Sequence, residues 1–143
     1  MTTEHIARSF SVSLHISHPD IDPAEISSAV HLTPKRMTRA GAPRTTPKGD
    51  PLKGTYEFSH WMHEFDVGKA SELGIIIERL IARLQAHELF YHRIVEDGGA
   101  VELFCGVFAD GNWDEIISHS LMSQLAALKI DLRLDVYPKA KPQ

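Results

Sequence analysis

The amino-acid sequence predicts an α+β fold: a two-layer sandwich in which helices cover mainly one face of a sheet of four or more strands. Three observations support this prediction: apolar and polar residues alternate near both ends of the chain, helical spacing runs through its middle, and turn and capping residues lie between these segments. With 143 residues, 43% of them hydrophobic, the chain is long enough to bury a substantial core. We therefore expect residues 1–143 to form a single domain, with a flexible C-terminal tail at 138–143.

The chain begins with the pattern of a strand followed by a short helix. Residues 8–16 alternate serine and histidine with apolar side chains, which is typical of a half-buried strand. Asp22 precedes Pro23 and is followed by Glu25 three positions later, the residue pattern of a helix N-terminus. The pattern predicts a helix that ends at about Val30.

A long basic segment separates this helix from the next strand. Residues 33–54 contain four prolines, three glycines and six lysines or arginines, a composition that predicts a long basic loop. Residues 55–61 resume a strand pattern, with Tyr56 and Phe58 on one face.

The middle of the chain predicts the longest helix. Apolar residues follow helical spacing within 66–87, from Leu73 to Leu84. Residues 89–95 fit either an extension of this helix or a strand, and the acidic and glycine residues at 96–99 end the element in both cases.

The last third of the chain predicts a strand, a helix and a second strand. Residues 100–108 are apolar at almost every position, as in a strand at the centre of a sheet. Asn112 and Glu115 repeat the capping pattern before a helix that we expect to end at about Ala127. Residues 130–137 alternate again. The side chains expected to point inward there are Ile130, Leu132, Leu134 and Val136, and those expected to point outward are Asp131, Arg133, Asp135 and Tyr137.

The two ends of the chain share the same order of sequence patterns. Each has a strand, a turn, a capping pattern followed by isoleucine (Ile26 and Ile116), a helix and another strand. One interpretation is an internal β-α-β repeat around the long central helix, and the alternative is chance similarity. If all helices lie on one side, the other face of the sheet stays hydrated.

The cysteine content, the length of the apolar segments and the net charge exclude or disfavour several classes of function. The single cysteine, Cys105, excludes an internal disulfide and a cysteine-based zinc cluster, and its apolar strand indicates a core residue rather than a nucleophile. No segment has the apolar length of a membrane span or an export signal. A net charge of -4 disfavours general binding of nucleic acid. We therefore expect a cytoplasmic protein without a cofactor.

The open face of the predicted sheet is the first candidate site. Acidic and aromatic side chains on such a face suit a protein partner or self-association and would repel phosphate. The expected function is therefore a non-enzymatic protein-binding module, immunity-like or regulatory, unless 33–54 or 89–95 folds over the face. The candidate binding residues are Glu57, Trp61, Asp131, Arg133 and Asp135.

The basic segment is a second candidate. Arg36, Arg39 and Arg44 could hold a small anion, because guanidinium groups form paired hydrogen bonds with phosphate or carboxylate. The alternative is a solvated loop that balances an acidic body.

Histidines supply the third candidate. His60 and His63 precede Glu64 in an order that matches no zinc-protease motif, and residues three apart on a strand point to opposite faces. A small metal-dependent enzyme or metal protein that uses this pair remains an alternative. A general acid and base formed by His15 and nearby carboxylates is the enzymatic interpretation of the open face.

Several segments together resemble a known family. Residues 21–26 lead to Leu-Thr-Pro at 32–34, Arg-Ala-Gly follows at 39–41, a strand ends in Trp61, and 125–137 reads LAALKIDLRLDVY. This pattern resembles a bacterial domain family of unknown function, number 4279, over nearly the whole chain. The resemblance implies a small, stand-alone, intracellular bacterial domain and brings no activity, cofactor or catalytic residue.

Overall fold

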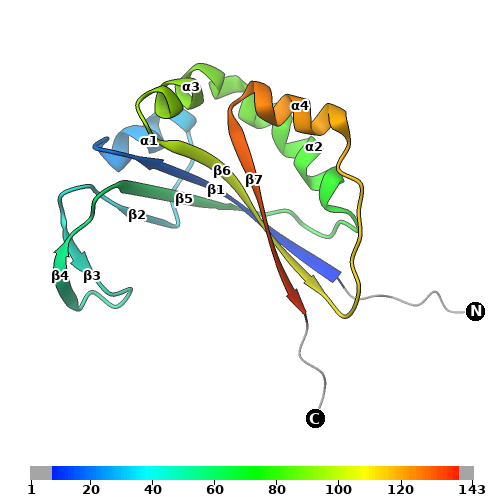
Figure 1. Cartoon of the computed structure of the whole chain (residues 1–143), viewed down its shortest axis with the longest axis horizontal. Helices are drawn as coiled ribbons and strands as arrows, with labels where there is room; N and C mark the ends of the chain where they lie inside the picture. Colours follow the sequence, from blue (N-terminus) through cyan, green and yellow to red (C-terminus); the bar gives the residue numbers. More distant parts are fainter. Residues whose placement is uncertain (1–7, 139–143) are drawn as a thin grey trace, which may run out of the picture.

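The computed structural model describes residues 8–138 (Figure 1). The elements in this range are β1 (Arg8–His18), α1 (Pro23–Val30), β2 (Arg36–Thr38), β3 (Pro43–Thr45), β4 (Pro51–Thr55), β5 (Ser59–Phe65), α2 (Leu73–Leu84), the 3-10 turn η1 (Gln85–His87), α3 (Glu88–Glu96), β6 (Ala100–Ala109), α4 (His119–Ala127) and β7 (Ile130–Pro138). The predicted α+β sandwich is confirmed. Apart from Pro138, the expected C-terminal tail lies outside the described residues.

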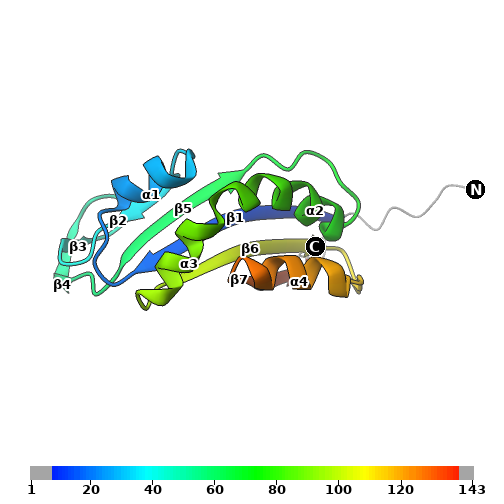
Figure 2. The same cartoon turned by 90° about the horizontal axis from the view of Figure 1, so that it is seen from above.

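A five-stranded sheet forms one layer. Its strand order is β2-β5-β1-β6-β7. Neighbouring strands are antiparallel except β6 and β7, which are parallel. The helices lie together over one face of this sheet, as Figure 2 shows from above. Strands β3 and β4 form a separate hairpin beyond the β2 edge (Figure 1).

Two β-α-β units are present, but the first does not end in the strand expected at 55–61, because β5 in that region is antiparallel to β1. In the second unit, α4 connects the adjacent parallel strands β6 and β7. In the first, α1 connects β1 to β2, which are also parallel because each is antiparallel to β5 between them. The units therefore differ by one inserted strand, and α2 and α3 lie between them in the chain.

The core lies between the helices and the convex face of the sheet. Alternate residues of β1 and β6 point toward the helices and are fully buried, as period-two patterning requires. Helix α2 adds a buried stripe at helical spacing. The principal members of this core are Val12, Leu14, Ile16, Ile77, Leu80, Ile81, Leu103, Cys105 and Val107. No helix among residues 8–138 has the length and apolar character needed to span a membrane.

The expectation that 33–54 is a loop was wrong. It contains β2, which pairs with β5 at the sheet edge, and the hairpin β3–β4. The hairpin turn is closed locally: the amide of Thr46 donates to the carbonyl of Asp50, and the amide of Gly49 donates to that of Thr46. Gly49 has a φ of +93° there, a value glycine adopts without strain. The composition of 33–54 predicts turns, but it does not reveal that part of this segment pairs with the distant strand β5.

The predicted strand at 55–61 was also misplaced. Residues 56–58 form the turn between β4 and β5, so Tyr56 and Phe58 lie outside both strands. Tyr56 is held there by backbone hydrogen bonds, since its amide donates to Ala42 and its carbonyl accepts from Gly41.

The helices begin later than predicted. Helix α2 starts at Leu73 rather than near residue 66, and 89–95 belongs to α3. The predicted cap at Asp22 is confirmed, because its carboxylate accepts from the amide of Ala24.

Glu115 does not cap the helix that follows it. Helix α4 begins after Ser118, whose hydroxyl accepts from the Leu121 amide.

Candidate functional site

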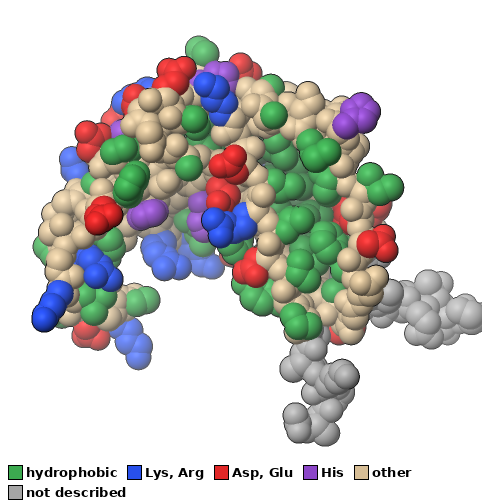
Figure 3. Space-filling model, in the orientation of Figure 1, with side chains coloured by type: hydrophobic (Ala, Val, Ile, Leu, Met, Phe, Trp, Pro, Cys, Tyr) green, Lys and Arg blue, Asp and Glu red, His purple; other side chains and the backbone are tan. Residues whose placement is uncertain are grey.

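The face of the sheet that the helices leave uncovered forms a groove. The sheet curves around it, and the β3–β4 hairpin continues the wall on one side (Figures 1 and 3). The hollow has a volume of about 820 Å³, within the range of ligand-binding clefts. Its lining combines backbone and side chains of His15, Ile16, Ser17, Arg36, Met37, Thr38, Thr45, Thr46, Pro47, Tyr56, His60, Trp61, Met62, Ala100, Glu102, Phe104 and Arg133. Neither 33–54 nor 89–95 covers this face, because the first lies at its edge and the second is on the helix side.

Strand register places one row of side chains across the uncovered face, from the groove lining to Asp131 just beyond it. Arg36 pairs with Met62, Met62 with His15, His15 with Glu102, and Glu102 with Asp131. Paired residues on neighbouring strands share a face of the sheet. The row therefore has a cation at the β2 end and a carboxylate at the β7 end.

His15 lies at the middle of this row, on the central strand. Its Nε2 is 2.9 Å from Ser13 Oγ, and its ring centroid is 5.2 Å from that of Phe104. The imidazole is thus oriented by a hydroxyl on its own strand and by an aromatic ring on β6.

The surroundings of His15 favour its neutral form. Burial lowers the pKa of the imidazole below its ordinary value of 6.5. The carboxylate of Glu102 opposes that shift, and the positive charges of Arg133, Arg36 and His60 add to it. Among these smaller contributions, those of Arg133 and Arg36 place two guanidinium groups within electrostatic range of the imidazole.

Glu102 is held by Arg133 rather than by His15. The Nε of Arg133 donates to Glu102 Oε1 at 2.8 Å. A Ser-His-carboxylate triad needs the acid to orient the histidine, and here the acid is engaged elsewhere. Ser13 is also only 6% exposed. Ser13, His15 and Glu102 therefore do not form such a triad.

Aromatic side chains extend the face beyond the groove. The rings of Phe108 and Tyr137 stack with centroids 4.9 Å apart and planes 12° apart. The hydroxyl of Tyr137 donates to the carboxylate of Asp135.

Three of the five predicted sheet-face residues lie on the uncovered face, and two do not. Register places Asp131, Arg133 and Asp135 there. Trp61 was expected to point outward, but it is 1% exposed and its Nε1 donates to Ser27 Oγ at 3.0 Å beneath α1. Glu57 is exposed in the turn before β5. Both errors come from taking Tyr56 and Phe58 as inward strand residues, because these lie in the turn and pairing with β1 directs the odd-numbered residues of β5 toward the helices.

The three arginines of the basic segment do not converge. Arg36 faces the groove. Arg39 forms an ion pair with Asp22 at 3.3 Å, beside α1. Arg44 donates to the carbonyl of Lys53 within the hairpin. A shared anion site for all three is therefore not formed.

His60 and His63 point to opposite faces, as their strand spacing predicts. His60 lines the groove. His63 lies on the helix side, where its Nδ1 is 2.6 Å from the carbonyl oxygen of Thr33 and its ring contacts those of Trp61 and Phe65. Within residues 8–138, no three His, Cys, Asp or Glu side chains are arranged to hold a metal ion.

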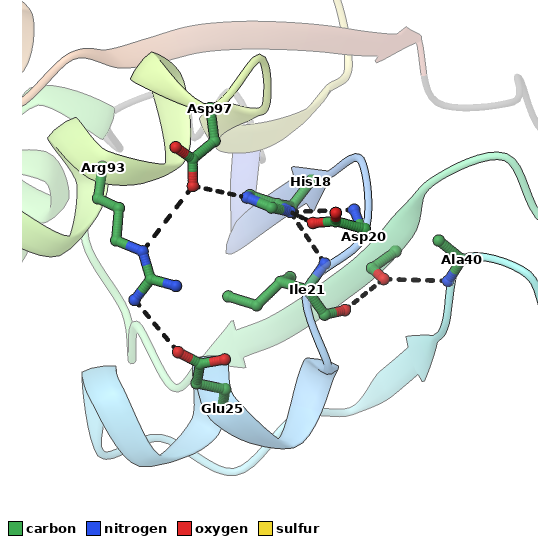
Figure 4. A network of polar contacts seen from close by, with 8 residues as sticks. His18, Asp20, Ile21, Glu25, Ala40, Arg93 and Asp97 are labelled. Carbon is green, nitrogen blue, oxygen red and sulfur yellow. Dashed lines mark hydrogen bonds and ion pairs between the residues drawn. The ribbon is translucent and has the colours of Figure 1, made fainter.

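Sequence reasoning missed the role of His18, which is 4% exposed at the end of β1 (Figure 4). Its Nδ1 accepts hydrogen bonds from the amides of Asp20 at 3.1 Å and Ile21 at 2.9 Å. Its Nε2 therefore carries the proton and donates to Asp97 Oδ2 at 3.0 Å. The only local signal is the His-Pro-Asp turn, which does not reveal Asp97.

Neighbouring polar groups extend this contact into a structural network. Arg93 lies between Asp97, at 3.8 Å, and Glu25 of α1, at 3.1 Å (Figure 4). The hydroxyl of Ser59 donates to the carbonyl of Ile21 at 2.5 Å and accepts from the amide of Ala40 at 3.0 Å. The network joins α1, α3 and β5 around one turn and lies away from the groove.

Comparison with known proteins identifies a family but no characterised relative. No curated protein and no solved structure matches the chain. The family described as a domain of unknown function (DUF4279) matches residues 8–139, a range that includes every described strand and helix. The chain therefore belongs to domain-of-unknown-function family 4279.

Proposed function

We propose that this chain is a protein-binding module, immunity-like or regulatory rather than catalytic, whose partner binds in the groove of the uncovered sheet face. The observation that carries the proposal is the hollow of about 820 Å³ on the one face that no helix covers. A concave surface with polar groups on an apolar floor suits a segment of a partner protein.

The charge pattern of the floor supports a partner of defined polarity. Arg36 at the β2 end favours an acidic side chain, and Asp131 at the β7 end favours a basic one. Met62 and Phe104 supply apolar surface between them. The carboxylates Glu102 and Asp131 disfavour a polyphosphate backbone, so nucleic acid suits this face poorly.

Selection of short random peptides displayed on phage, followed by titration calorimetry, tests the proposal. We expect the selected peptides to bind the wild-type chain and to lose at least about tenfold in affinity for Arg36→Glu. Asp131→Lys should weaken the same peptides at their other end. Arg79→Glu, an exposed change on α2, is the matched control and should leave binding unchanged.

Peptides with reversed charges test whether Arg36 itself contacts the acidic residue of the peptide. A peptide whose acidic residue is replaced by lysine should recover affinity for Arg36→Glu. Peptides that bind Arg36→Glu and Asp131→Lys as tightly as the wild-type chain would contradict the proposal.

A small anion is a second candidate ligand for the same groove. The observation that favours it is that two guanidinium groups, those of Arg36 and Arg133, line the groove. A carboxylate or phosphate among them would be electrostatically stabilised. Inorganic phosphate or succinate should then raise the thermal unfolding midpoint of the wild-type chain and not that of Arg36→Ala.

A further inference from the structure

The two edges of the sheet differ sharply. Strand β2 forms one edge with three residues, whereas β7 forms the other with nine and follows β6 in regular register along its whole length. Natural edge strands are usually short, bulged, or protected by lysine or proline. Between Ile130 and Tyr137, β7 contains no lysine, proline or bulge; its charged residues there are Asp131, Arg133 and Asp135, and Pro138 ends the strand. Its outer backbone groups are therefore available to another strand.

Apolar side chains are also exposed at this edge. Leu134 and Val136 are 44% and 49% exposed, although they point to the helix side of the sheet. Their register partners on β6, Cys105 and Val107, are fully buried on that same side. Figure 3 shows hydrophobic side chains gathered beside the lower half of β7. The core is thus incomplete where β7 continues beyond the helices.

We propose that a second copy of this chain binds here, with the two β7 strands antiparallel about a two-fold axis at Leu134. Leu134 is the midpoint of Ile130–Pro138, so this register aligns the two strands along their whole length, with Pro138 contributing only its carbonyl. It places Leu132 of each copy opposite Val136 of the other, and Arg133 opposite Asp135. Two five-stranded sheets then form one continuous sheet.

The charges of β7 select this register. Moving the axis to Arg133 would place two arginines opposite one another, and moving it to Asp135 would place two aspartates opposite one another, which is unfavourable. An axis at Leu132 keeps opposite charges together but overlaps only residues 130–134. Arg133 can serve both Glu102 and the second copy, because a guanidinium has five donors.

Sedimentation velocity of the full chain tests the inference by a charge exchange. We expect the wild-type chain to dimerise, and Arg133→Asp and Asp135→Arg each to weaken dimerisation on the order of a hundredfold by placing like charges opposite one another. An equimolar mixture of the two variants should dimerise again, because each then supplies the charge the other lacks. Arg79→Asp is the control for a charge change away from the edge.

Three outcomes would overturn the inference: a wild-type chain that stays monomeric at every concentration, single variants that dimerise as well as wild type, or a mixture of folded variants that stays monomeric. Circular dichroism reports whether each variant is folded. Val136→Lys, at a half-exposed position, is the alternative if either charge variant unfolds, and it too should be monomeric. Because Val136 does not line the groove, peptide binding to Val136→Lys tests the proposed function separately from dimerisation.

Discussion

His18 and Asp97 are 79 positions apart in the sequence, yet Nε2 of His18 lies 3.0 Å from Oδ2 of Asp97. The contact ties the end of β1 to the C-terminus of α3 (Figure 4). The other ring nitrogen accepts the amides of Asp20 and Ile21 and so fixes the turn that leads into α1. One buried side chain therefore sets the relative positions of three elements.

Replacing His18 should destabilise the fold strongly. His18→Ala leaves the two amides without their acceptor and removes a buried ring, so we expect the free energy of unfolding to fall by about 2–4 kcal/mol. Urea denaturation followed by circular dichroism measures this loss. Asp97→Asn keeps an acceptor oxygen and should cost only about 1 kcal/mol. A His18→Ala variant as stable as Asp97→Asn would show that the two amide contacts contribute little.

Glu115 should act as a cap for a helix far away in the sequence. Its two carboxylate oxygens accept from the amides of Leu73 at 2.9 Å and Gly74 at 2.6 Å, at the start of α2. Glu115→Ala leaves those first-turn amides without this acceptor, and we expect a loss of about 1–2 kcal/mol in the free energy of unfolding. The neighbouring change Asp114→Ala, at an exposed position, is the control for the same denaturation experiment. Equal stability of the two variants would exclude the capping role.

His15 should make stability depend on pH in the mildly acidic range. Burial lowers its pKa in the folded chain below the ordinary value of 6.5, so the unfolded chain binds more protons between these two pKa values. The free energy of unfolding must then fall as pH decreases through that window. We expect His15→Gln to reduce this slope, as measured by urea denaturation between about pH 7 and about pH 5.

His87 should contribute to the same pH dependence of stability. Burial also lowers the pKa of His87, with a smaller contribution from His31. His87→Gln should therefore reduce the slope in the same direction, and the double variant should reduce it further. A slope in His15→Gln equal to that of wild type would contradict the assignment.

Cys105 should be inert to thiol reagents in the folded chain. The prediction of a core residue is confirmed, since Cys105 is fully buried, and burial raises the pKa of its thiol to about 12. The thiolate is the reactive form, so Ellman's reagent should react only at the rate at which the chain unfolds. Unfolding in urea should expose one reactive thiol per chain. Rapid stoichiometric reaction without denaturant would show that the strand opens.

Local pattern predicted the strand faces that build most of the candidate site. Alternation along β1 and β7 assigned His15, Asp131, Arg133 and Asp135 to the uncovered face, and their register confirms it. This works because side chains of a strand alternate between faces whatever its partners are. The same rule misplaced Trp61, because Tyr56 and Phe58, used to choose the inward face, lie in a turn, whereas pairing with β1 decides the face of β5.

The sequence by itself determined the α+β class, the cap at Asp22 and the buried strands, all of which follow from spacing along a few neighbouring residues, and its resemblance over nearly the whole chain indicated the family. Only the tertiary structure decided that the basic segment pairs with β5, that Glu115 caps α2, and that His18 meets Asp97. Each is a pairing between distant segments, and such pairs form because buried amides, carboxylates and imidazoles must find partners once the core excludes water. The spacing of apolar residues in the sequence predicts which side chains are buried, whereas the tertiary structure determines which polar groups bind one another.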